Sequence, residues 1–188
     1  MAAGRRRTLA RELEGKVQFV RRAYLLLPGE GQRPAYDEYV VSHRVRAAEM
    51  NPDLGFAIPR VGQKYPRSSV PAQLVAAAVQ QEHPDRLEAL EDELFGAMFR
   101  ELRDVSDPAE LRKCGEAAAV PDGSVDRALS DPALRDRVFT EHQEALDDGV
   151  RGIPALVVPG YAPITGAIPL DMLRRAFAEV VDSRTDRP

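Results

Sequence analysis

The feature that most constrains the fold is a block of helices between residues 71 and 149, whose beginnings are marked by proline. Asp107-Pro108 and Asp131-Pro132 each place an acidic residue where a helix is capped and proline at the first helical position. Apolar residues then recur every three or four positions, the spacing of one buried helix face. Gly149 supplies the residue type that often ends a helix. The block predicts a set of helices that pack on one another.

Sequences of a different kind flank this block. Residues 17–27 are rich in β-branched, aromatic and leucine side chains, which predicts one buried strand. Residues 152–158 read Gly-Ile-Pro-Ala-Leu-Val-Val and predict a short strand that returns through residues 163–167 as a hairpin. Pro169 then opens a last amphipathic helix. Strands on both sides of a helical block indicate a sheet interrupted in sequence by helices.

The same signals predict the structure of the remaining segments. Residues 8–14 have the pattern of the last turns of a helix, and residues 34–50 have helical spacing. Residues 51–71 contain four prolines and two glycines, which predicts a long loop. Loops of this length in compact domains often carry function.

The charge and hydropathy of the chain exclude two classes of partner. Lys and Arg number 26 against 30 Asp and Glu, a net charge of −4, so there is no basic field to attract nucleic acid or anionic lipid. Apolar runs fall short of the roughly 20 residues that a membrane helix needs. The first residues carry arginines but lack the apolar core of a signal peptide. We therefore expect a cytoplasmic protein that binds neither nucleic acid nor membrane.

The order of these segments resembles the DsbA-like thioredoxin-fold family, which includes thiol-disulfide oxidoreductases, 2-hydroxychromene-2-carboxylate isomerases and kappa-class glutathione transferases. The segments that carry the resemblance are residues 25–28, 65–72, 94–99 with 103–108, 148–154 and 164–169. The resemblance implies an α/β fold in which a thioredoxin-like sheet carries a large inserted helical domain. The expected parts are residues 1–33 and 150–188 for the thioredoxin-like domain and residues 34–149 for the helical insert.

The chain departs from the family at its beginning. Family members start with a strand and then a Cys-x-x-Cys pair, or a serine in the glutathione-using branches, at the N-terminus of a helix. Here Met1 falls inside that helix, and Cys114 is the only cysteine. In the family, the N-terminus of this helix lowers the pKa of the thiol and so activates it. The present sequence contains neither that thiol nor that helix N-terminus. We expect the natural start to lie upstream of Met1, the alternative being a sheet that closes differently, through a partner.

The resemblance assigns the substrate-binding residues that remain to Gly152, Ile153 and Pro154. In the family, a cis-proline at this place lies against the active-site thiol and presents backbone groups to a bound peptide or glutathione. The preceding residue, here Ile153, helps to set redox behaviour and partner choice. We therefore expect Pro154 to be cis, and we assign no catalytic residue and no metal ligand within the chain.

The other reactive side chains are expected to have structural roles. Cys114 lies on the apolar face of a capped helix, several residues past its beginning, which favours a buried thiol. Ser68 and Ser69 precede Pro71 and are expected to cap the helix that follows. The histidines lie far apart, without the spacing of a metal site. They are His43, His83 and His142.

Three functions remain open. The first is a DsbA-family thiol-disulfide oxidoreductase, inactive in this form because its redox cysteine pair is absent; it needs no cofactor and takes a peptide or a small thiol or disulfide as its partner. The second is an isomerase or transferase of the hydroxychromene-carboxylate or kappa type, with glutathione as co-substrate. The third is a non-catalytic thioredoxin-fold binding module. A second copy of the chain, in a homodimer, is a further candidate partner.

Overall fold

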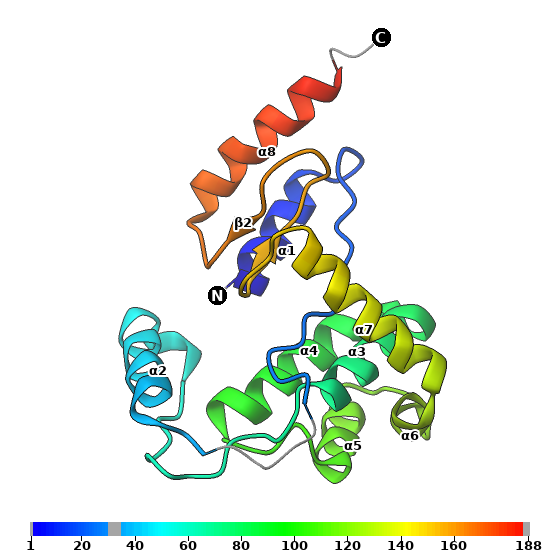
Figure 1. The fold of residues 1–188 in the computed structure, drawn as a ribbon. Helices are drawn as coiled ribbons and strands as arrows, with labels where there is room; N and C mark the ends of the chain where they lie inside the picture. The colour runs from blue at the N-terminus through cyan, green and yellow to red at the C-terminus, as the bar shows by residue number, and fades with distance from the viewer. Residues whose placement is uncertain (1, 30–34, 186–188) are drawn as a thin grey trace. The chain divides into compact units, whose positions relative to one another are not determined.

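The computed structural model describes residues 2–29 and 35–185 of the chain (Figure 1). The chain divides into two compact units. One combines Met1–Arg22 with Glu144–Pro188, and the other is Ala23–Gln143. The first unit carries the hairpin and the terminal helices, and the second carries most of the helical block.

Helices build the second unit, and the predicted helical block over residues 71–149 is confirmed. In chain order the elements are α2 (Glu38–Met50), the 3₁₀ turn η1 (Pro52–Leu54), α3 (Val70–Glu82), the 3₁₀ turn η2 (Pro84–Arg86), α4 (Leu87–Phe95), the π-helical turn η3 (Gly96–Arg100), α5 (Pro108–Ala117), α6 (Ser124–Ser130) and α7 (Pro132–Asp147). The last residues of α7 belong to the first unit. Between η1 and α3 the chain has no regular helix or strand, as the prolines there predict.

The acidic residues before the helical prolines act as caps. The Asp107 carboxylate accepts the N–H of Ala109 at 2.8 Å, and the Asp131 carboxylate accepts the N–H of Ala133 at 2.9 Å. Each bond satisfies one of the amide groups that a helix beginning leaves without a partner. The beginnings of α5 and α7 thus follow directly from the Asp-Pro pairs.

Helix α3 lies at the centre of the second unit's core. Val70, Val75 and Val79 are at most 1% exposed, and they belong to one buried apolar cluster that also contains Leu111 and Val138. These residues come from three helices with apolar faces at helical spacing. Burial of these faces, which removes apolar surface from water, is the main source of stability for this unit.

Helix α2 begins later than the sequence predicts. Its first residue is Glu38, because the Asp37 carboxylate accepts the N–H of Val40 at 2.7 Å and fixes the helix beginning there. The predicted beginning, residue 34, lies outside the described residues. Asn51 ends the helix, as the following proline predicts.

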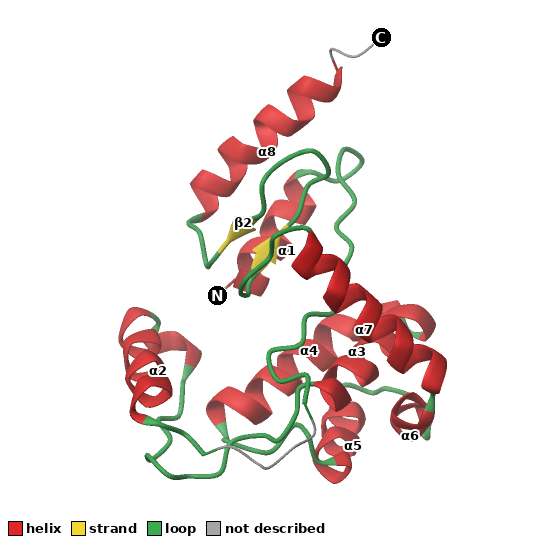
Figure 2. Cartoon of the chain, viewed as in Figure 1, coloured by secondary structure: helices red, strands yellow, loops and turns green. Residues whose placement is uncertain are grey.

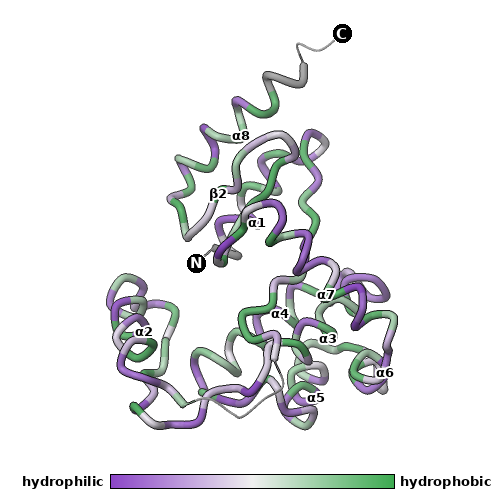
Figure 3. The backbone as a smooth tube through the Cα atoms, viewed as in Figure 1, coloured by the Kyte–Doolittle hydropathy of each residue, from purple (hydrophilic) through white to green (hydrophobic). Residues whose placement is uncertain are grey.

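The first unit joins two helices to a two-stranded hairpin. The helices are α1 (Ala2–Glu12) and α8 (Leu170–Thr185), and the strands β1 (Ala155–Leu156) and β2 (Ile164–Thr165) pair antiparallel, with Ala155 opposite Thr165. Figure 2 shows these strands as two short arrows within longer loops. The coloured part of helix α8 carries both hydrophilic and hydrophobic residues (Figure 3). Its Leu173 and Phe177 pack against Leu9 of α1 in a second buried cluster.

The predicted strand over residues 17–27 is wrong, because the segment contains neither a strand nor a helix. A strand is defined by a ladder of hydrogen bonds to a neighbour. Here alternate backbone N–H groups bond to side chains instead: Ala23 to Glu141 at 2.8 Å, Leu25 to His142 Nδ1 at 3.2 Å and Leu27 to the Ser69 hydroxyl at 3.1 Å. A spacing of two is that of extended chain. These side chains therefore accept the backbone hydrogen bonds that a neighbouring strand would accept in a sheet.

Within residues 2–29 and 35–185, no helix is long and apolar enough to cross a bilayer.

Candidate functional site

The three residues assigned from the sequence form an exposed corner immediately before β1. The peptide bond between Ile153 and Pro154 is cis. Ile153 is 47% exposed, Pro154 is also exposed, and Gly152 is half-buried. The C=O of Pro154 accepts the N–H of Gly166 at 2.8 Å, which continues the pairing of the hairpin up to the corner. We refer to Gly152, Ile153 and Pro154 as the corner.

Hydrogen bonds fix the chain on both sides of the hairpin. Before the corner, Arg151 donates to the C=O of Leu146, at the end of α7, at 2.6 Å. After β2, Arg5 of α1 donates to the C=O groups of Ala167 at 2.6 Å and Ile168 at 2.9 Å. These contacts lie within one unit and hold the hairpin against its helices. The corner is therefore held in place from both sides by hydrogen bonds although it is itself exposed.

Strand β1 is paired along one edge only. Its partner in the sheet is β2, and no other strand of residues 2–29 and 35–185 pairs with it. Leu156 and Val158 pack toward the cluster of α1 and α8, whereas Val157 is 44% exposed. A strand edge presents N–H and C=O groups in a row and can receive another extended chain. The corner leads directly into this edge.

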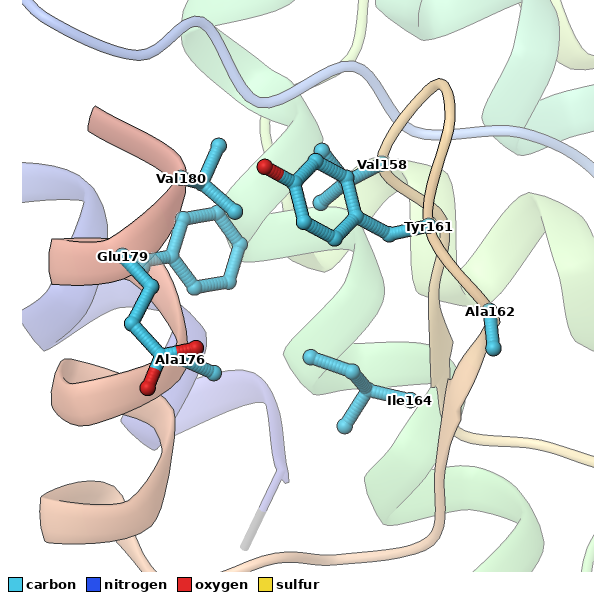
Figure 4. A pocket seen from close by; sticks show the side chains of 8 residues that line it. Val158, Tyr161, Ala162, Ile164, Ala176, Glu179 and Val180 are labelled. Atoms are coloured by element: carbon cyan, nitrogen blue, oxygen red, sulfur yellow. The ribbon is translucent and has the colours of Figure 1, made fainter. Parts of the chain in front are cut away.

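A cavity of about 280 Å³ lies between the hairpin and α8. Figure 4 shows the Tyr161 ring on the hairpin side, facing Val180 on α8. Most of the lining is aliphatic or aromatic, with the hydroxyl of Tyr161 and the carboxylate of Glu179 as its polar groups. No local sequence signal indicates this cavity, because the fold alone brings residues 158–164 to residues 176–180. The cavity offers volume for a small apolar group but no nucleophile.

Cys114 is buried in the core of the second unit, as predicted. Its side chain on α5 is fully buried. Burial raises the pKa of the thiol; the charge of Arg103 acts in the opposite direction, while Glu93 and Glu110 add to the increase. A thiol with a raised pKa stays protonated, and the thiolate is the form that attacks disulfides. Cys114 therefore has the properties of a structural residue.

The histidines make separate contacts in the structure. His142 accepts the N–H of Leu25 and meets the ring of Tyr24 edge-on, with centroids 5.0 Å apart. The Nδ1 atom of His43 lies 2.8 Å from the C=O of Tyr39. In the part of the chain that the structure describes, no group of three His, Cys, Asp or Glu side chains is arranged to hold a metal ion.

The expectation for the serines before α3 is wrong in part. Ser69 occupies the cap position of α3 but makes no side-chain cap. Its hydroxyl accepts the N–H of Leu27 at 3.1 Å, and Ser68 donates to the C=O of Leu27 at 3.1 Å. Ser68 also accepts the N–H of Val70 at 3.1 Å. Within the described part of the chain no strand pairs with Leu27, and its backbone bonds to the serine hydroxyl groups instead.

Comparison with known proteins identifies the fold. A candidate protein disulfide isomerase from Nitrosomonas europaea superposes with a TM-score of 0.76, at 17% identity, over 96% of this chain and 90% of its own. A candidate DsbA oxidoreductase from Streptomyces coelicolor superposes with a TM-score of 0.78, at 20% identity, over 99% of this chain and 84% of its own. At these identities the likeness establishes the fold alone.

The family itself is given by sequence. No curated protein matches the chain. The model of the DSBA-like thioredoxin domain, however, matches residues 3–178, which is nearly the whole chain. The α/β fold with inserted helices agrees with this match, and the single cysteine agrees with the lack of a Cys-x-x-Cys pair. The chain therefore belongs to the DSBA-like thioredoxin domain family.

Proposed function

We propose that this chain binds the substrate in thiol-disulfide exchange, at the corner and along the open edge of β1. The observation that carries the proposal is the unpaired edge of β1, which begins at the exposed Ile153 and Pro154. An extended peptide with a cysteine or a disulfide would add to this edge through backbone hydrogen bonds. The exposed side chains of Ile153 and Val157 would contact alternate side chains of that peptide.

The exchange reaction needs two thiols that this chain does not contain. In the first step a thiolate attacks one sulfur of the substrate disulfide, forming a mixed disulfide and releasing the other sulfur as thiolate. In the second step a resolving thiolate attacks the mixed disulfide, so the pair is oxidised to a disulfide and the substrate is reduced. Cys114 is the only cysteine of the 188 residues and is buried. The chain is thus proposed to supply binding and orientation, and not the attacking sulfur.

Binding is tested by NMR on the isotope-labelled chain. The probe is a ten-residue unstructured peptide with one S-methylated cysteine, which cannot form a disulfide. We expect saturable shifts of the amide signals of Ile153, Ala155 and Leu156. Ile153→Glu should weaken binding at least tenfold, because it places a charge where an apolar contact is proposed. Met172→Glu is the matched control, since Met172 is 53% exposed and lies on α8 and not on the hairpin, and should leave binding unchanged.

The same titration with reduced glutathione separates the alternatives. Saturable binding of glutathione at the corner, without binding of the peptide, would favour the glutathione-dependent isomerase or transferase and contradict peptide binding. Binding of neither probe would contradict a substrate-binding role at the corner. The intact mass and N-terminal sequence of the protein isolated from its own cell then show whether a cysteine pair accompanies the binding residues.

A further inference from the structure

Arg44 of α2 is a buried arginine that forms no ion pair with any carboxylate of the described residues. It is 6% exposed. Its guanidinium carbon lies 4.5 Å from the ring centre of Phe99 and 6.0 Å from that of Phe56. Its hydrogen bond to the C=O of Phe99 is long, at 3.5 Å, and that carbonyl already accepts the N–H of Ala57 at 2.9 Å. Among residues 2–29 and 35–185, the positive charge therefore lies against aromatic faces and a shared carbonyl, without a carboxylate.

Such an arrangement is electrostatically incomplete. Moving an ion out of water is costly, and buried charges in proteins are normally paired with an opposite charge. A cation over an aromatic face recovers part of that cost, but the ring contributes no negative charge. A buried guanidinium held this way keeps a strong positive potential. An anion of suitable shape would complete it.

The tyrosine pair whose charge Arg44 influences does not compete with such an anion. The rings of Tyr36 and Tyr65 meet edge-on, with centroids 4.6 Å apart. Burial raises the pKa of Tyr65, and Tyr36 adds to the increase, while the charge of Arg44 acts in the opposite direction. Tyr65 therefore keeps its proton and brings no negative charge of its own.

The loop beside Arg44 is suited to an apolar group. Phe56 and Phe99 are only half-buried, so both rings keep some exposed surface next to the buried cation. The loop that carries Phe56 also exposes Ile58 (44%) and Val61 (58%). The bond from Ala57 to Phe99 fastens this loop to η3. A charged centre with apolar rings around it matches an anion that has an apolar part.

We propose that Arg44, with Phe56 and Phe99, binds the carboxylate of a small apolar molecule. The planar fork of a guanidinium matches the two oxygens of a carboxylate. One cation balances one negative charge, whereas phosphate carries more than one at neutral pH and is commonly held by several donors. The site lies within the second unit and is independent of the role proposed for the corner.

The test uses 4-fluorobenzoate, followed by its fluorine NMR signal and by the thermal midpoint of the protein. 4-Fluorobenzamide, which has the same shape without the charge, and inorganic phosphate are the comparison ligands. Arg44→Met removes the charge and keeps much of the apolar stem. Arg46→Met is the matched control, because Arg46 is exposed on the same helix. Arg44→Lys is a second variant, which keeps the charge but loses the fork.

We expect 4-fluorobenzoate to bind the unaltered chain at least tenfold more tightly than the amide does. Binding should fall at least tenfold in Arg44→Met, fall severalfold in Arg44→Lys, and stay unchanged in Arg46→Met. If Arg44→Met does not fold, the proposal is tested by the Arg44→Lys variant and by the ratio of the affinities for 4-fluorobenzoate and 4-fluorobenzamide. Equal binding of acid and amide, equal binding in all variants, absence of binding, or tighter binding of phosphate would each overturn the proposal.

Discussion

The carboxylate of Glu141 accepts the backbone N–H of Ala23 at 2.8 Å, although the two residues lie 118 positions apart in the sequence. Glu141 is 4% exposed and Ala23 is fully buried. The other carboxylate oxygen of Glu141 accepts from Arg137 at 2.9 Å. The carboxylate on α7 thus accepts the backbone hydrogen bond of residue 23, which in a sheet a neighbouring strand would accept. This bond holds the backbone of residue 23 against α7.

Removal of this carboxylate is expected to destabilise the protein clearly. Glu141→Ala would leave the N–H of Ala23 buried without its partner, lowering the free energy of unfolding by about 2–3 kcal/mol. Glu141→Gln keeps an oxygen acceptor and should lose about half as much. Urea denaturation measures both. Glu144→Ala is the control, because Glu144 pairs with Arg22 on the surface and should cost under about 1 kcal/mol. Similar losses at both positions would contradict this role of Glu141.

The ion pairs of Glu110 predict a dependence of stability on pH. Hydrogen bonds from Lys113, at 2.6 Å, and from Arg103, at 3.0 Å, lower the pKa of Glu110. A carboxyl with a lower pKa in the folded state stabilises the protein above its unfolded pKa, about 4.3, and loses this effect as pH falls through the folded value. Glu110→Gln should therefore destabilise at pH 7 and much less at pH 3.

Urea denaturation at pH 7, 5 and 3 tests this. Glu116→Gln serves as the control, since Glu116 is exposed on the same helix, and its effect should be small at every pH. A loss for Glu110→Gln that is the same at pH 7 and pH 3 would show that the pairs do not contribute through charge.

The buried thiol predicts slow chemistry. Cys114 should react with Ellman's reagent at least 100-fold more slowly in the native protein than in guanidinium chloride, because the reagent needs an accessible thiolate. Titration after unfolding should give one thiol per chain. Cys114→Ser should be less stable than Cys114→Ala, since the hydroxyl would lie in an apolar cluster. Fast reaction in the native state would show that the helical core opens readily.

Gly166 is expected to be required for its backbone conformation. Its φ of +90° is one that other residues rarely adopt, and its N–H closes the bond to Pro154. Gly166→Ala should cost about 1 kcal/mol or more. Gly152→Ala is the matched control: a Cβ meets open space at both positions, but Gly152 lacks the positive φ. Thermal denaturation of the two variants compares them, and equal midpoints would contradict the conformational argument.

The helices and the hairpin could be predicted because their signals are local. The Asp-Pro pairs act within three residues, and the caps at Asp107 and Asp131 are as expected. The corner before β1 was assigned from a short motif, through its resemblance to a family, and its role in substrate binding stays a prediction. In these places the local sequence and the fold agree.

The predicted strand over residues 17–27 failed for a physical reason. The apolar pattern of a strand records which side chains are buried, and Val17 and Phe19 do pack on the cluster of α1 and α8. The pattern does not record what the backbone bonds to. That depends on Glu141 and His142, far along the chain. Arg44 was missed similarly, because its rings come from the loop after η1 and from η3.

Because the only cysteine is buried, a thiol-reactive label can be directed to a second cysteine introduced on the surface. Ile153 is 47% exposed and lies next to the open strand edge. A cysteine introduced by Ile153→Cys would therefore be the single accessible thiol of the chain, because Cys114 is buried. A maleimide dye or a spin label would then attach at one known position without replacement of Cys114. The unaltered protein is the negative control for such labelling, because its buried Cys114 should not react with the label as long as the core is folded.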